Sequence, residues 1–346
     1  MRVQAAEAVL IAFTYIGTVV GAGFASGREI DQFFLQSSPW LLGVIVAAGV
    51  FALLGVPLIR IGQGSDESVG AALRPSCGRA LAGLTELVLG AALFGGLCIM
   101  IAGGGAAFDQ AFGVPLWVGL LGMTAISWLT VRAGIAGLKV ANALVVPALV
   151  GITGLVWYFV QAGPPAPPGP IAQGTPAGAL GSAVLYALFN TALALPVILS
   201  LGASATHTKR ATTGLLLGVA TVALLVAAVG ATLVASGPAA MARPIPMLFI
   251  AGRLHPWLHH LYFVALLGEI YTTAIGNLFG VAKSLEHRFK VGPGTAAGVA
   301  CLAALAVSAL GFSQLVETLY PAFGYAMGGL IVLAVARRIL VSAAAA

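Results

Sequence analysis

The chain has 346 residues, of which 60% are hydrophobic and only 8% are charged, and its formal net charge is +6. Long apolar runs separated by short polar stretches extend along the whole sequence, which excludes an ordinary soluble domain and indicates a polytopic membrane protein. The basic excess is therefore better explained as a topology signal than as a nucleic-acid-binding surface.

A membrane-spanning helix needs ~20 predominantly apolar residues, and by this measure the sequence predicts an all-α fold with ten spans. Their approximate ranges are 7–35, 40–62, 80–107, 115–131, 138–160, 178–203, 211–236, 257–286, 294–311 and 315–338. We expect the first span to be retained, because the start of the chain does not have the sections of a cleavable signal peptide.

Lysine and arginine residues are distributed unevenly between the predicted connections. If the amino terminus is cytoplasmic, all of them fall on that side except Arg243 and Arg253, in an outside loop, and Arg28, inside a span. This bias predicts an even number of spans and places both termini in the cytoplasm.

The stretch from Gly17 to Ile30 is the most informative part of the first span. It contains Gly21, Gly23 and Gly27 and ends in the charged pair Arg28 and Glu29. Lipid offers no hydrogen-bond partners to a broken helix, so such a segment is expected to line a cavity enclosed by protein. The alternative is that its glycines only allow neighbouring helices to approach closely.

A proline-rich connector divides the chain into two sets of five spans. The predicted units are a first five-helix repeat over 1–162, an extracytoplasmic connector over 163–177 and a second repeat over 178–346. Because five is odd, the second set enters the membrane from the opposite side, as in an inverted repeat.

The sixth span, which corresponds to the first, carries Asn190 and Pro196 near its middle. Proline removes a backbone donor, so this span is also expected to break. Interrupted helices at corresponding places of two halves indicate the central binding site of a transporter, whereas a single proline kink would indicate nothing.

The eighth span combines a buried acid, Glu269, with two adjacent hydroxyls, Thr272 and Thr273. Hydroxyls in membrane helices often only bond back to carbonyls one turn earlier. An ionisable residue inside a span is, in contrast, a functional candidate by default, and Glu269 could bind a cation or take up a proton.

Together, these features resemble the LeuT fold of the amino acid–polyamine–cation transporter superfamily, a ten-helix, five-plus-five inverted repeat with broken helices 1 and 6. The stretch Gly17 to Ile30 is similar to the first span of the YkvI-type bacterial membrane proteins. Resemblance to the YkvI type covers nearly the whole chain, whereas that to LeuT-type transporters is confined to short motifs. The resemblance to these bacterial proteins implies a location in the bacterial inner membrane.

The resemblance implies a sodium site as well. Carried over by position, its ligands are the carbonyls of Gly17, Val20 and Glu269 and the hydroxyls of Thr272 and Thr273. Neutral oxygen ligands of this kind suit a small hard cation. No organic cofactor is expected.

A substrate site beside this ion is implied between the first and sixth spans. It would comprise Val20, Gly21, Ala22, Gly23 and Phe24 on one side and Phe189, Asn190, Thr191 and Ala192 on the other. Free amides at the helix break could hold a carboxylate. Phe24 stands where a polar ligand for a second sodium ion would be expected, which favours one sodium ion.

LeuT-type proteins place an arginine after the first-helix break and an acid on the tenth helix as an outer gate. In this chain the corresponding residues are Arg28 and Glu317. The alternative is a local pair of Arg28 with Asp31 or Asp109 that stabilises the helix end.

The resemblance thus implies a sodium-coupled symporter of a small organic solute, such as an amino acid or related carboxylate, that works by alternating access. The alternatives are a proton-coupled transporter that uses Glu269 and a membrane receptor or assembly subunit that transports nothing. An enzyme is not predicted, because no His-rich metal motif, Ser-His-Asp set or nucleotide loop is visible. The predicted partners are the lipid bilayer and the solute, with no nucleic acid and no particular oligomeric state.

Overall fold

A computed structural model describes residues 2–63, 69–134, 138–163, 174–205 and 207–344. All regular secondary structure in these ranges is helical. The first half comprises α1 (Arg2–Val19), α2 (Ala22–Ser26), α3 (Arg28–Ile30), the π-helical turn η1 (Asp31–Leu35), α4 (Trp40–Gly62), α5 (Val69–Phe112), α6 (Leu116–Ala133) and α7 (Leu138–Ala162). The second half comprises α8 (Pro176–Ser204), α9 (Thr208–Ser236), α10 (Pro238–Met241), α11 (Pro246–Leu254), α12 (Pro256–Phe289), α13 (Pro293–Ser308) and α14 (Phe312–Ala344).

Eight helices in the described ranges are long and apolar enough to cross a membrane. They are α4, α5 from Gly78 onward, α6, α7 from Leu144, α8, α9, α12 as far as Glu286 and α14 as far as Arg337. Two shorter apolar helices, Glu7–Val19 and Pro293–Ser308, occupy the places of the predicted first and ninth spans. The protein is therefore an all-α membrane protein.

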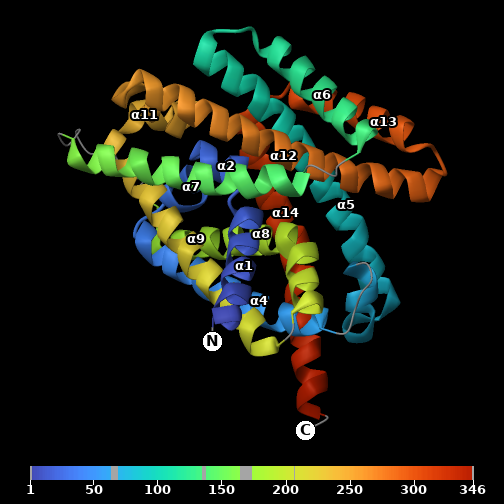
Figure 1. The fold of residues 1–346 in the computed structure, drawn as a ribbon. Coiled ribbons are helices and arrows are strands. Elements are labelled where there is room, and N and C mark those ends of the chain that lie inside the picture. The colour runs from blue at the N-terminus through green and yellow to red at the C-terminus, as the bar shows by residue number, and fades with distance from the viewer. Residues whose placement is uncertain (1, 64–68, 135–137, 164–173, 206, 345–346) are drawn as a thin grey trace.

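The helices form two packed groups, which Figure 1 shows in its lower and upper parts. Helices α1, α4, α8 and α9 pack on one another, and so do α5, α6, α12 and α13. Helix α7 packs against α9 and α12, and α14 packs against α5 and α8, so these two helices bridge the groups.

The first segment changes direction where its glycines lie. Helix α1 ends at Val19, Gly21 is extended with φ −95° and ψ −173°, and α2 begins at Ala22. Gly27 then ends α2 in the left-handed region, with φ 82°, a conformation that side chains other than glycine rarely adopt. Both changes fall within the stretch that the sequence singles out.

The predicted break in the sixth span is wrong as far as secondary structure is concerned. Helix α8 continues from Pro176 to Ser204 through both Asn190 and Pro196. A proline removes one amide donor and crowds the carbonyl one turn earlier, but a helix in a membrane protein can continue through it where neighbouring helices pack against it, as α4 and α14 pack against α8. The Asn190 side chain adds a bond within the helix, to the Tyr186 carbonyl at 3.2 Å.

The expected connector over 163–177 lies largely outside the described residues, which resume at Gly174. Thr175 then caps α8, because its hydroxyl accepts a hydrogen bond from the Gly178 amide at 3.1 Å. Between α9 and α12, where the sequence predicts only a loop, the chain forms the short helices α10 and α11.

Glycines bring α4 and α8 into direct main-chain contact. A Cβ atom at Gly62 would lie 2.1 Å from the Leu199 carbonyl oxygen, and one at Gly202 would lie 2.2 Å from that of Ile59. Neither position can therefore hold a larger residue without moving the backbone.

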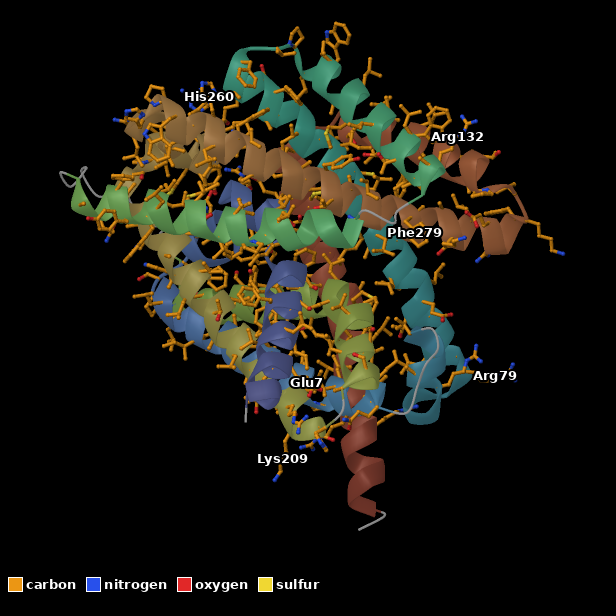
Figure 2. All side chains as sticks on the ribbon, in the orientation of Figure 1. Glu7, Arg79, Arg132, Lys209, His260 and Phe279 are labelled. Atoms are coloured by element: carbon orange, nitrogen blue, oxygen red, sulfur yellow. The ribbon has the colours of Figure 1, made fainter. Side chains whose placement is uncertain are left out.

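Polar side chains are prominent at the ends of the molecule. Figure 2 shows Glu7, Lys209 and Arg79 in its lower part and His260 near the top. The neighbouring Arg210 forms an ion pair with Glu7 at 3.0 Å, which connects the start of α9 to α1.

Candidate functional site

The centre of the candidate site is a hydrogen bond between Glu29 of α3 and Asn190 of α8. The Asn190 amide donates to Glu29 Oε1 at 3.0 Å, and the two residues are only 3% and 4% exposed. Glu29 lies two residues after Gly27, whose left-handed conformation separates α3 from α2. A carboxyl group is thus held inside the protein by a neutral partner.

An aromatic stack lies beside this bond. Phe189 stacks on Tyr320 of α14 with 4.1 Å between ring centroids, and Phe33 stacks on the same phenylalanine at 6.3 Å. The absence of a side chain at Gly23 lets Glu29 Oε2 and the Tyr320 hydroxyl approach the main chain closely. A Cβ atom at this position would lie 2.6 Å from Glu29 Oε2 and 2.8 Å from the Tyr320 hydroxyl. At Gly21, in contrast, a Cβ would meet no atom within 4 Å.

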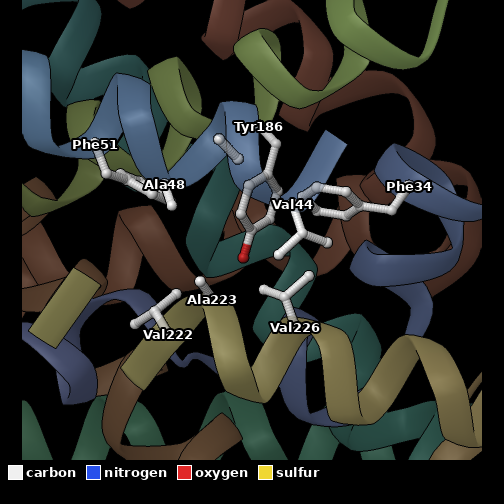
Figure 3. Close-up of a pocket in the computed structure, with 9 residues that line it drawn as sticks. Phe34, Val44, Ala48, Phe51, Tyr186, Val222, Ala223 and Val226 are labelled. Carbon is white, nitrogen blue, oxygen red and sulfur yellow. The ribbon is translucent and has the colours of Figure 1, made fainter. Parts of the chain in front are cut away.

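A small apolar cavity lies behind the stack, around Tyr186. Figure 3 shows the Tyr186 hydroxyl directed toward Val222 and Ala223 of α9. Within the described part of the chain this hydroxyl has no hydrogen-bond partner. Apart from this hydroxyl, the side chains that line the cavity are apolar.

The remaining predicted substrate residues are also enclosed. Val20, Ala22, Phe24, Thr191 and Ala192 are each 1% exposed. The Thr191 hydroxyl is buried and lacks a hydrogen-bond partner among the described residues. The first segment and α8 are joined by the Glu29–Asn190 bond and by the stack of Phe33 on Phe189.

Arg28 binds both of the partners that the sequence leaves as alternatives. Its guanidinium pairs with Glu317 of α14 and with Asp31 at 3.4 Å, and it also donates to the Met241 carbonyl at 2.9 Å. Asp109 is not among its ion-pair partners in the described chain. Arg28 therefore links the first segment to α14 and to α10.

The predicted sodium ligands on α12 lie within one turn. The Thr272 hydroxyl donates to the Glu269 carbonyl and the Thr273 hydroxyl donates to Glu269 Oε1, each at 3.3 Å. Glu269 is 3% exposed, and its Oε2 atom has no hydrogen-bond partner in the described ranges. This turn can present a carbonyl, a carboxylate and two hydroxyls.

The predicted ligands on α1 face the same turn of α7 as this part of α12. A Cβ at Gly17 would lie 3.2 Å from Val146, and a Cβ at Gly268 would lie 3.0 Å from Val145. Val20 is buried, and its amide still donates to the Ile16 carbonyl at 2.7 Å. Two adjacent valines of α7 thus lie beside Gly17 and beside Gly268, the residue that precedes Glu269.

Helix α2 is also held from the side of α12. The Tyr262 hydroxyl donates to the Ala25 carbonyl at 2.6 Å. The interrupted segment is therefore fixed between α8, through Glu29, and α12, through Tyr262.

The sequence has a curated relative over nearly its whole length, although no protein-family model matches it. It is 29% identical over 335 residues to the uncharacterized membrane protein YkvI of Bacillus subtilis (strain 168), and the alignment covers 94% of each chain. The chain is thus similar to this membrane protein along nearly its whole length. A second B. subtilis protein, the uncharacterized protein YyaD, is 27% identical over 146 residues, which are 42% of this chain.

Solved structures establish the fold of the YkvI-like chain. MhsT in complex with L-phenylalanine matches 93% of this chain and 87% of its own, with a TM-score of 0.68 and 17% identity. Mhp1, a nucleobase-cation-symport-1 family transporter in a closed conformation with bromovinylhydantoin bound, has a TM-score of 0.70 with 16% identity over 95% of this chain and 77% of its own. A manganese transporter of Eremococcus coleocola has a TM-score of 0.63 with 15% identity over 94% and 76%.

These neighbours are LeuT-fold transporters, so the chain has a LeuT-type fold, which is the fold that the resemblance in its sequence implies. The prediction from sequence does not include Glu29 or Tyr320 in the substrate site. Glu29 could have been identified as a candidate because it is an ionisable residue inside the first span. Nothing in the sequence near residue 320 indicates contact with Gly23.

Proposed function

We propose that this YkvI-like protein is a secondary active transporter of a small organic solute. The observation that carries the proposal is that a glycine-interrupted polar segment lies between α8 and α12, which belong to different helix groups. Transport would follow from rocking of α1, α4, α8 and α9 against α5, α6, α12 and α13, with solute and ion binding shifting the balance between the two arrangements. The transporter neighbours support this reading.

The proposal includes ten spans in two five-helix repeats of opposite orientation, over 1–162 and 178–346. Residues Glu7–Val19 together with α2 would form the first span, and Pro293–Ser308 the ninth. Both termini would lie in the cytoplasm of a bacterium, with the connector 163–177 outside. This orientation is supported by the positions of Arg79 and Lys209, which are expected on the cytoplasmic side. Both residues lie far from His260, at the other end of the molecule (Figure 2).

Sodium is the proposed coupling ion. Its ligands would be the carbonyls of Gly17, Val20 and Glu269 and the hydroxyls of Thr272 and Thr273. The proposal is supported by the position of the α12 oxygens within one turn and by the closeness of Gly17 and Gly268 to the adjacent Val146 and Val145 of α7. Binding would require the two hydroxyls to turn their lone pairs toward the ion.

The test is thermal unfolding of detergent-purified protein in sodium, potassium and choline chloride at equal ionic strength. At ~100 times its dissociation constant, sodium should add about 2.7 kcal/mol to the stability of the native state. The double variant Thr272→Ala/Thr273→Ala should lose this increment. Thr232→Ala is the matched control, because Thr232 is also buried and bonds to its own helix at 2.7 Å, but on α9.

Proton coupling through Glu269 is the second candidate, favoured by its burial and its unpartnered Oε2 atom. In this case stability should be insensitive to sodium and should change with pH, and Glu269→Gln should remove the change. Reconstituted vesicles then separate transport from a receptor or assembly role. A receptor would bind solute without accumulating it under either an ion or a proton gradient.

A further inference from the structure

Glu29 is a buried acid without a cationic partner. Its carboxylate is hydrogen-bonded to the neutral Asn190, and none of the ion pairs formed by the described residues involves it. The adjacent Arg28 is directed away, toward Asp31, Glu317 and the Met241 carbonyl. A negative charge at this place would therefore be only partly compensated.

An uncompensated carboxylate inside a membrane protein is costly, and such groups commonly mark a binding site for a cation or a proton. The surroundings of Glu29 favour a ligand. At the helix interruption, the position that a side chain of Gly21 would occupy is open space. Two residues further on, Glu29 Oε2 and the Tyr320 hydroxyl lie close to the main chain of Gly23. The stack of Phe33, Phe189 and Tyr320 forms an apolar wall next to these atoms.

The same geometry argues against a ligand that carries only a carboxylate. Helix α2 has five residues, so its dipole and free amides provide little positive potential. Glu29 lies against Gly23, within this helix, and would repel a second anion. A positive group is the complement of Glu29, and an apolar or aromatic tail is the complement of the ring stack.

We propose that the Glu29–Asn190–Tyr320 cluster binds the ammonium group of an amine-bearing solute whose apolar part packs on the Phe189 ring. This inference rests on the proposed transport function and narrows its solute class from small organic solutes in general to amines. Glu29 is a binding residue in this assignment, and Asn190 positions its carboxylate.

The experiment measures binding of three matched probes to the purified wild-type protein by isothermal titration, in saturating sodium. The probes are phenethylamine, which has only the amine, 3-phenylpropionate, which has only the carboxylate, and L-phenylalanine, which has both. We expect the two amines to bind and the carboxylate probe not to bind. Glu29→Gln should weaken amine binding at least ~30-fold, the effect of truncating one partner of a buried charge pair.

Two further variants serve as a conservative substitution and as a control. Glu29→Asp keeps the charge and should retain part of the affinity, so it serves if Glu29→Gln fails to fold. Glu286→Gln removes an acid that pairs with Lys283 at 2.9 Å, outside the proposed solute and sodium sites, and should leave amine affinity and selectivity unchanged. Binding of 3-phenylpropionate with an affinity equal to that of phenethylamine, failure of both amines to bind, or amine binding that survives Glu29→Gln would each overturn the inference.

Uptake into vesicles separates this inference from the proposed function. Amine binding without accumulation would leave the inference intact and count against transport. Accumulation of an anionic solute that persists in Glu29→Gln would support transport and contradict the assignment of the cluster to an amine.

Discussion

Asn190 Nδ2 lies 3.0 Å from Glu29 Oε1, and this bond joins two residues that are 161 positions apart in the chain. It connects α3 to α8 and sets the place of the buried carboxylate.

Removal of this bond should have a measurable thermodynamic cost. Asn190→Ala leaves the Glu29 carboxyl buried without its donor, so we expect a loss of about 1–3 kcal/mol in the free energy of unfolding. Glu29→Gln in the same background should recover part of the loss. A double-mutant cycle by thermal unfolding measures the coupling, and additive effects would contradict a direct interaction.

The pair of Arg28 and Glu317 should control access more than stability. Glu317 is 42% exposed, so Glu317→Gln should change the free energy of unfolding by only about 0–1 kcal/mol. In a cysteine-free background with Ala22→Cys, the same change should speed maleimide labelling severalfold. Glu286→Gln is the control, since it breaks the pair of Glu286 with Lys283 at 2.9 Å, far along α12. Equal labelling in both variants would remove the gate from the proposal.

Gly23 and Gly21 should respond differently to the same substitution. Gly23→Ala places a methyl group 2.6 Å from Glu29 Oε2 and 2.8 Å from the Tyr320 hydroxyl, so we expect a loss of solute binding together with about 1–3 kcal/mol of stability. Gly21→Ala meets no atom within 4 Å and keeps an extended backbone that alanine accepts, so it should fold like the wild type. Thermal unfolding of the two variants makes the comparison, and equal destabilisation would show that the contact at Gly23 is absent.

The bond from Tyr262 to the Ala25 carbonyl should determine how firmly α2 is held. Tyr262→Phe removes a hydrogen bond of 2.6 Å and should cost about 0.5–1.5 kcal/mol. Hydrogen exchange of the α2 amides should become faster. Tyr271→Phe is matched, because the Tyr271 hydroxyl bonds to Thr130 at 2.7 Å within one helix group, and it should leave exchange in α2 unchanged.

The sequence predicts the fold class and the place of the first-segment interruption because both depend on local signals, apolar length and glycine content. It also indicates Arg28 with Glu317, since their positions follow from the resemblance to LeuT-type proteins. The continuity of α8 through Pro196 could not be predicted, because it depends on packing against α4 and α14. Contacts of Glu29 with Asn190, and of Gly23 with Tyr320, join distant parts of the chain and are visible only once the helices are packed.

The touching main chains of α4 and α8 at Gly62 and Gly202 have a mechanical consequence. Sliding between packed helices takes place through small adjustments of the side chains between them. At Gly62 and Gly202 no side chains separate the two main chains, so this adjustment is not available there. In the proposed rocking motion, a displacement of α8 near Asn190 should therefore carry α4 with it, and the two helices should move as one rigid unit joined at this glycine crossing.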